Sequence, residues 1–419
     1  MVTATLRMYA VGFGDCFLLT VPRFGDRPWR MLVDCGVHGM GRSEHSLGTV
    51  ITDVLETCRD GDGGAGGGAG AGGKPVIDLV VASHGHQDHI AGFTDARWEE
   101  VTVGEVWLPW CEDPTDTEAQ RLRTRLDGAA RTLHQRFAVD GPEIAAIALN
   151  SLSNERAMTT LRDGFAGAPV RRFQSATAPV RTELPGLPDA RIHLLGPARS
   201  EEAIKAMDPP ELERWLALGA APAAGSGPGL SGSESLGPFG PAYGIADRDL
   251  FRQRFPHLDT DDDLLDHPVL DPDDALAAAS WLDRCLNNTS LVFVVEIEDV
   301  RIVFPGDAQW GVWREILANT DARALLERAT LYKVSHHGSH NGSPKSLVHD
   351  VLPDHVTSMM SFRSMERWTA IPQTDLVAAL RTPGRTLLRP DEDLPAGGAA
   401  GVGEVRRAAD GLWTEIDLG

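Results

Sequence analysis

Runs of hydrophobic residues along the chain predict strands that alternate with helices. The first strand-like runs are Leu6–Ala10, Cys16–Val21 and Trp29–Val33, and turns with glycine or proline separate them. In Glu118–Phe137 the apolar residues recur at helical spacing instead. Further strands are predicted over Val76–Ala82, Gly104–Pro109, Arg191–Leu195, Leu291–Val295, Arg301–Phe304, Val356–Phe362, Thr386–Arg389, Gly403–Arg407 and Leu412–Leu418, and further helices over Ser43–Cys58, Asn154–Phe165, Ala275–Leu286 and Gln309–Leu317. This alternation indicates a layered α/β fold.

The length and composition fit one large domain with insertions. The chain has 419 residues, of which 42% are hydrophobic. That is enough for one large α/β domain with insertions or for two modest ones, and we predict a single domain over residues 1–419. Residues 61–73 are almost entirely glycine and alanine and predict a flexible surface loop. Residues 205–285, rich in small residues and then in aspartate, predict an acidic, loop-rich insertion that could form a lid.

The charge and the cysteine pattern restrict partners and compartment. A formal charge of -21 disfavours long duplex nucleic acid as a habitual partner, whereas a small or single-ended anionic substrate stays open. There is no run of about 18 apolar residues, so no membrane span is expected, and no secretory signal is recognisable. The 5 cysteines are scattered and read as reduced thiols, which suggests a cytoplasmic protein. The pattern predicts no oligomeric state.

The predicted strand from Val76 ends in a dense polar turn. The turn reads His84-Gly85-His86-Gln87-Asp88-His89. His84 and His86, two positions apart at a strand tip, project to the same side, and Asp88 and His89 follow on the turn. Imidazoles mixed with a carboxylate suit borderline cations such as zinc or manganese. The sequence therefore predicts a metal site here.

This turn resembles the signature of the metallo-β-lactamase superfamily. The segments that end in Asp307 and in His336-His337 look like its other ligand strands, and the earlier segment that ends in Asp34 looks like the one whose aspartate supports a ligand without binding metal; all stand in the family's order. The resemblance implies a four-layer αββα sandwich with two divalent metal ions (Zn or Mn). The implied ligands are His84, His86 and Asp307 for the first ion, and Asp88, His89, Asp307 and His337 for the second.

Several short segments are similar to the ComEC-type branch of the superfamily, the hydrolase domain of DNA-uptake channels and its stand-alone relatives. They are Val11–Leu19, Gly196-Pro197 and the Asn287-x-x-Ser290-Leu291-Val292 start of a strand. No histidine stands where other branches carry a third ligand for the first ion, so water or Asn287 could take its place. The branch's later Gly-His-Pro is replaced by Ala370-Ile371-Pro372, and Arg363 or Arg367 could substitute for that histidine.

Two assignments stay open at this stage. Either His336 or His337 could be the ligand; the resemblance favours His337, with His336 on the opposite side of an extended chain facing substrate. Asp307 could also be the N-cap of the helix Gln309–Leu317, a role that is compatible with binding metal. His340 and Asn341 follow on the same loop and could touch substrate.

The expected activity is metal-dependent hydrolysis by a hydroxide that the metals hold. Asp88 would orient the nucleophile, and His336 and Arg363 would meet charge on the substrate. A phosphodiester is the leading substrate; the alternatives are an acyl hydrolase for a lactone or thioester, and a non-catalytic, metal-stabilised regulatory protein. With carboxylates from Asp88 and Asp307 alone, two dications and a hydroxide would leave the site net positive and attractive to anions.

Overall fold

The structure is a computed structural model of mixed α/β type, and it describes most of the chain. It describes residues 3–38, 44–59, 73–138, 154–184, 186–206, 208–215, 284–363, 371–395 and 401–419, and positions 145, 148, 149, 282, 398 and 399. Nearly all of the predicted loop 61–73, and all but the ends of the predicted insertion 205–285, lie outside these residues. Loop, lid and single-domain organisation therefore stay predictions.

The first sheet joins the two ends of the described chain. Its order is β14-β15-β1-β2-β3-β4-β5-β6. The strands are β1 (Ala4–Tyr9), β2 (Cys16–Val21), β3 (Trp29–Cys35), β4 (Val76–Val81), β5 (Thr102–Pro109), β6 (Val170–Gln174), β14 (Val405–Arg407) and β15 (Trp413–Leu418). β1 and β15 are antiparallel, with Ala4 opposite Leu418, whereas β3 to β6 run parallel. The first sheet is therefore complete only when β15, near the end of the chain, pairs with β1.

The second sheet has the order β13-β12-β11-β10-β9-β8-β7. Its strands are β7 (Val180–Leu184), β8 (Leu187–Gly196), β9 (Val292–Ile297), β10 (Val300–Phe304), β11 (Leu331–Lys333), β12 (Thr357–Met359) and β13 (Thr386–Leu388). β10 to β13 run parallel, as β3 to β6 do in the first sheet. In each sheet, the loops that follow the parallel strands therefore all begin at the same end of the strands.

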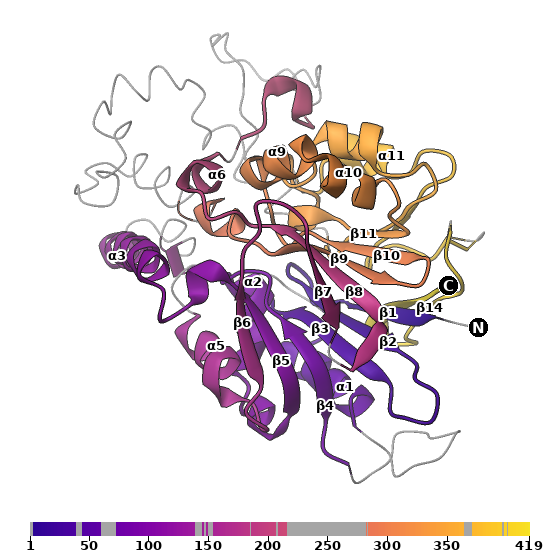
Figure 1. The fold of residues 1–419 in the computed structure, drawn as a ribbon, viewed down its shortest axis with the longest axis horizontal. Coiled ribbons are helices and arrows are strands. Elements are labelled where there is room, and N and C mark those ends of the chain that lie inside the picture. Colours follow the sequence, from indigo (N-terminus) through magenta and orange to yellow (C-terminus); the bar gives the residue numbers. More distant parts are fainter. Residues whose placement is uncertain are drawn as a thin grey trace.

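Helices surround the two sheets, and some of them cover the outer faces (Figure 1). They are α1 (Leu47–Thr57), α2 (Gln87–Ile90), α3 (Thr117–Phe137), α5 (Glu155–Thr159), α6 (Glu201–Lys205), α9 (Trp310–Ala318), α10 (Thr320–Leu326) and α11 (Thr374–Ala379). α9, α10 and α11 lie over β9 to β11, while α1 and α5 lie at the opposite side, beside β4 and β5 (Figure 1). In the described part of the chain, no helix is long and apolar enough to cross a membrane.

A hydrophobic core joins the two sheets. Phe17 of β2 meets Phe304 of β10 with ring centroids 6.1 Å apart, and Phe293 of β9 stacks on Phe304 at 5.2 Å. All of these rings are buried in one cluster with residues from both sheets. Burial of such side chains contributes roughly 1.5–3 kcal/mol each. This core fixes how the carboxyl ends of the two sets of parallel strands meet.

Candidate metal centre

Four buried side chains converge from loops of both sheets. Asp88 and His89 follow β4, Asp307 follows β10, and His337 follows β11. One ligand atom of each lies within 4.8 Å of those of the others. Oδ2 of Asp307 is 3.1 Å from Nε2 of His89 and 3.6 Å from Nε2 of His337, and Oδ2 of Asp88 is 3.4 Å from Nε2 of His337. We call these four residues the ligand cluster.

The ring of His89 is oriented by Asp34 at the end of β3. Nδ1 of His89 lies 2.8 Å from Oδ2 of Asp34 and donates to it, so Nε2 is the nitrogen that faces the ligand cluster. Asp34 also accepts hydrogen bonds from the backbone N–H and the hydroxyl of Ser83, each at 2.7 Å. Its φ is 57°, a left-handed conformation that aspartate tolerates better than most residues. Asp34 therefore ties β3 to the start of the metal-site turn.

A close backbone contact places this turn. A Cβ added to Gly36 would lie 2.5 Å from the carbonyl carbon of Asp88 and from the backbone nitrogen of His89. Glycine is therefore required at position 36, because any side chain would displace two members of the ligand cluster.

His337 is held by a different acceptor. Its Nδ1 donates to the backbone oxygen of Ser361 at 2.9 Å, and the ring of Phe13 packs 4.4 Å away, centroid to centroid. Nε2 again faces the ligand cluster. The expectation of an extended chain at His336-His337 was wrong. Both residues are left-handed, with φ of 48° and 50°, because the chain makes a tight turn over Ser335–Gly338. Such strain, of order 1 kcal/mol or more per residue, is typical of functional sites.

Asp307 is not a helix cap. Helix α9 begins at Trp310 with Gln309 at the N-cap position. The backbone N–H of Asp307 donates to the hydroxyl of Ser290 at 3.1 Å, and its carboxylate faces the ligand cluster. The alternative role as N-cap is therefore wrong.

His84 and His86 form a neighbouring pair. Nε2 of His84 lies 3.0 Å from Nδ1 of His86, and Nδ1 of His84 lies 3.1 Å from the hydroxyl of Ser83. The hydroxyl of Ser83 donates to Asp34, so Nδ1 of His84 donates to Ser83 and leaves its Nε2 lone pair facing His86. The His84 ring is 4.2 Å from the His89 ring. The pair adjoins the ligand cluster without being part of it.

His336 lies half-buried beside the ligand cluster, and its ring nitrogens contact residues outside that cluster. Nδ1 contacts the hydroxyl of Ser339 at 2.7 Å, and that hydroxyl donates to Oδ1 of Asn341 at 2.7 Å. This network makes Nδ1 of His336 the protonated nitrogen. Its Nε2 lies 3.5 Å from the amide nitrogen of Asn287. Asn341 thus helps to orient His336, whereas burial first, and then Arg284, lower the pKa of His340 to about 3.

Arg363 is engaged with an acidic partner. Its guanidinium forms an ion pair with Glu44 at 2.6 Å, and its side chain is 40% exposed. Within the described part of the chain, it forms no hydrogen bond or ion pair with the ligand cluster. Arg367 and Ala370 lie outside the described residues.

Two buried charged residues beside the ligand cluster, Asp15 and Lys333, were not among the predicted site residues. Nζ of Lys333 lies 3.0 Å from the backbone oxygen of Gly306 and 3.4 Å from Oδ1 of Asp307, and it pairs with Oδ2 of Asp15. The backbone N–H of Asp15 donates to the backbone oxygen of Asp88 at 3.0 Å. Lys333 merely ends an apolar strand and Asp15 sits in a glycine turn, so no local pattern marks either residue.

Asp15, Asp34 and Lys333 change the predicted charge of the site. Asp15 and Asp34 add two buried carboxylates to those of Asp88 and Asp307, and Lys333 adds one ammonium. The count based on two carboxylates was therefore wrong. Two dications with one hydroxide would leave these charged groups balanced instead of net positive.

The buried charges shift the pKa values of the carboxyl groups and of the imidazoles in opposite directions. Burial raises the pKa of the carboxyl groups of Asp88 and Asp307, but His89 and His337 outweigh it and leave both pKa values low. Burial lowers the pKa of His89 and His337, and the carboxylates, Asp307 foremost, outweigh it and raise both. In the metal-free protein, protons on these imidazoles therefore balance the carboxylates. A dication would replace those protons.

The donor set fits a divalent cation. Nε2 of His89, Nε2 of His337 and Oδ1 of Asp88 are buried and have no hydrogen-bond partner among the described residues. Buried polar atoms normally have partners, and these three belong to one ligand-sized group. Two imidazole nitrogens with two carboxylates suit zinc or manganese.

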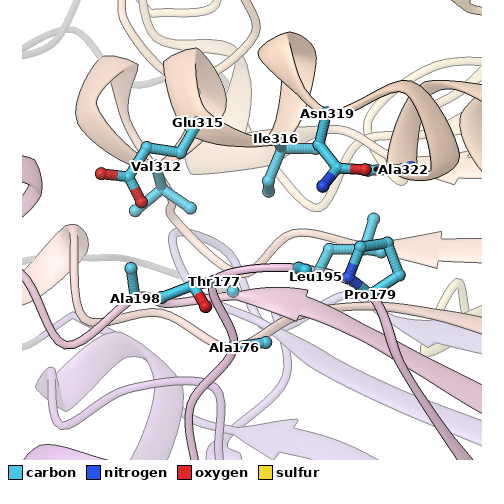
Figure 2. Close-up of a pocket in the computed structure, with 12 residues that line it drawn as sticks. Ala176, Thr177, Pro179, Leu195, Ala198, Val312, Glu315, Ile316, Asn319 and Ala322 are labelled. Atoms are coloured by element: carbon cyan, nitrogen blue, oxygen red, sulfur yellow. Dashed lines mark hydrogen bonds between the residues drawn. The ribbon is translucent and has the colours of Figure 1, made fainter.

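A small cavity lies apart from the ligand cluster. It lies between the chain around Ala176–Pro179 and helices α9 and α10, with Val312 and Glu315 on one side and Thr177 on the other (Figure 2). Its volume is about 10 Å³, which is room for one water molecule at most. It cannot admit a substrate.

Comparisons with known proteins give little beyond the geometry. No family model matches the chain, and no curated protein matches it. Among solved structures, the chain is similar to Zn²⁺-bound PqqB from Methylobacterium extorquens, with 10% sequence identity and a TM-score of 0.37 over 93% of this chain and 100% of that chain. That TM-score is too low to assign fold or function, so the functional conclusion rests on the ligand cluster.

Proposed function

We propose that this protein is a metal-dependent hydrolase of metallo-β-lactamase type, with the four-layer αββα arrangement of that superfamily. The observation that carries the proposal is the ligand cluster: Asp88, His89, Asp307 and His337 come from three distant segments and present ligand atoms within 4.8 Å of one another. Each imidazole has its other nitrogen held, by Asp34 or by Ser361, which is typical of histidine ligands to metals.

The proposed centre holds two divalent cations, zinc or manganese. Asp88, His89, Asp307 and His337 would hold one, and His84, His86 and Asp307 the other. The adjacent nitrogens of His84 and His86, 3.0 Å apart, support the second position, since they can share one hydrogen or face one cation. The four carboxylates also support it, because one dication with Lys333 would leave them undercompensated.

Bound cations would lower the pKa of a water molecule and stabilise negative charge that develops on the substrate. The protein's own groups do the rest. Asp88 accepts a proton or hydrogen bond from the nucleophile through Oδ1, which lacks a partner among the described residues. His336 lies half-buried beside the ligand cluster and can give a proton to a leaving group through Nε2 once it is protonated there.

A phosphodiester is the substrate that we propose first, in a nuclease-like or phosphodiesterase-like reaction. Its transition state carries negative charge on several oxygens, so a group outside the metal ligands must meet part of it. We assign this role to His336, and Arg363 would join it on leaving Glu44. A small or single-ended anion fits the acidic chain better than a long duplex does.

One observation favours an acyl substrate, such as a lactone or thioester. Arg363 is already paired with Glu44 at 2.6 Å, so substrate charge would have to compete with a carboxylate for it. An acyl transition state carries one oxyanion, which a metal alone can stabilise. Arg363 would then be dispensable.

Activity of single variants distinguishes the two substrates. Metal-loaded wild type, His336→Ala and Arg363→Ala are compared on bis-p-nitrophenyl phosphate, a lactone and a thioester, with metal content measured in parallel. Arg381→Ala is the matched control, because Arg381 has similar exposure, 42%, and also pairs with a glutamate.

For a phosphodiesterase, His336→Ala and Arg363→Ala should each lose about 10²-fold in turnover at unchanged metal content. Arg381→Ala should match wild type. Unchanged phosphodiester turnover in both test variants would favour the acyl substrate. Wild-type protein that bound no divalent metal would refute the metal-dependent function itself.

A further inference from the structure

Lys333 places an ammonium group directly behind the ligand cluster. It is the last residue of β11 and only 2% exposed. Burial of an unpaired ammonium is costly, so such a residue is tolerated only where its partners compensate the loss of water. What Lys333 binds therefore indicates what it does.

The three N–H donors of Lys333 face three oxygen atoms. These are the backbone oxygen of Gly306 at 3.0 Å, Oδ1 of Asp307 at 3.4 Å, and Oδ2 of Asp15. An ammonium has three donors and no acceptor, so this set uses its full capacity. No donor is left over for a substrate, and Lys333 is accordingly no candidate for direct catalysis.

The contact with Asp307 divides the two oxygens of that carboxylate. Oδ1 faces Lys333, while Oδ2 faces His89 at 3.1 Å and His337 at 3.6 Å. The backbone N–H of Asp307 is fixed separately by Ser290 at 3.1 Å. Rotation of the carboxylate would break the contact with Lys333, so its orientation is fixed before any cation arrives.

We propose that Lys333 is a positioning residue, which occupies Oδ1 of Asp307 so that divalent cations meet Oδ2 alone. Asp15 is the second anchor of the same ammonium and holds it in place. The inference rests on the proposed metal-dependent function, since it assigns a role at that centre. The ammonium of Lys333 repels cations bound nearby, and the fixed orientation of Asp307 outweighs this repulsion.

Whether removal of Lys333 weakens or tightens metal binding distinguishes a positioning role from a purely electrostatic one. A lysine near a dication repels it, so removal of Lys333 would tighten metal binding if charge alone mattered. If Lys333 positions Asp307, its removal weakens binding instead. The double variant Lys333→Met/Asp15→Asn removes one positive and one negative charge, so its net charge equals that of wild type. It also avoids a buried, unpaired Asp15, which could unfold the single variant Lys333→Met.

The test measures metal binding without substrate. Metal-free wild type, Asp15→Asn, Lys333→Met and the double variant are titrated with Zn²⁺ and Mn²⁺ against a chromophoric chelator, and the visible spectrum of the Co²⁺-loaded proteins reports coordination. Unfolding followed by circular dichroism checks that each variant folds.

The double variant should bind metal about tenfold more weakly or worse, the usual effect of losing a residue that orients a ligand. Its Co²⁺ spectrum should show weaker absorption, because Asp307 can then offer both oxygens and raise the coordination number. Asp15→Asn keeps a side-chain oxygen for Lys333 and should keep the wild-type spectrum.

A folded double variant with wild-type affinity and spectrum would overturn the role of Lys333 while leaving the proposed function intact. Tighter binding by Lys333→Met would likewise overturn it and show that the ammonium acts through charge. Failure of wild type itself to bind metal would count against the proposed function, and so the two failures are distinguishable.

Discussion

Replacement of Asp34 by asparagine tests whether the ligand cluster depends on the orientation of His89. In wild type, Asp34 accepts hydrogen bonds from Nδ1 of His89 at 2.8 Å and from Ser83. The amide of Asp34→Asn can keep the bond from the Ser83 backbone N–H, but its NH₂ group then faces His89. The imidazole must lose that bond or move its proton to Nε2, which blocks the nitrogen that would bind metal.

The expected magnitude follows from the bond that is lost. A hydrogen bond to a charged group contributes about 1.5–3 kcal/mol. Since each 1.4 kcal/mol is about tenfold in an equilibrium constant, metal affinity should fall roughly 10- to 150-fold. The left-handed φ of 57° does not confound the comparison, because asparagine tolerates that conformation as well as aspartate does.

The assay is a competitive titration of metal-free protein with Zn²⁺. Asp34→Asn should show the weaker affinity while its unfolding, followed by circular dichroism without metal, stays cooperative. The same change is then made in a His89→Ala background. There it should have almost no further effect, because the ring through which Asp34 acts is gone. Wild-type affinity of Asp34→Asn, or an equal loss in both backgrounds, would refute the reasoning.

Other predictions concern Asp307, pH and the glycine-rich tract. Asp307→Ala should lose about 100-fold or more in metal affinity, because it removes a ligand shared by both proposed ions, and elemental analysis that found full metal content would contradict this. The pKa values of His89 and His337 are raised on folding. These groups therefore stabilise the metal-free protein below about pH 6.5, and this stabilisation is lost as pH rises through the raised values. Zn²⁺ affinity should rise over the same pH range, and a flat pH profile in both titrations would rule out these imidazoles as ligands. Halving residues 61–73 should leave metal content unchanged and alter stability by only about 0.6 kcal/mol; loss of folding would show that the tract is structural.

The sequence predicted those elements whose cause is local. The predicted strand Cys16–Val21 agrees with β2, and Glu118–Phe137 differs from α3 by one residue. Both carry a clear apolar period or run. Strands β6 and β7 were missed, because their sequences, VRRFQ and VRTEL, are charged and partly exposed. They form through pairing with β5 and β8, which sequence periodicity does not report.

Some residues of the candidate site could likewise be predicted from local sequence, and others could not. Asp88, His89, Asp307 and His337 could be found from their positions after apolar strands, and the structure brings them together. Lys333 and Asp15 could not, because their role depends on contact between residues far apart in the sequence. The turn at His336-His337 also escaped prediction, because the left-handed conformation of two consecutive non-glycine residues is imposed by tertiary contacts.

The pairing of β1 with β15 has a consequence for the order in which the protein can fold during its synthesis. β1 is an inner strand of the first sheet, yet one of its two neighbours is made from residues 413–418. At about 5–20 residues per second, the ribosome needs roughly 20–80 s to travel from β1 to β15. During that time the nascent chain exposes an unpaired strand edge, which invites association with other chains. Expression conditions that slow translation should therefore increase aggregation, and supply of metal should not prevent it.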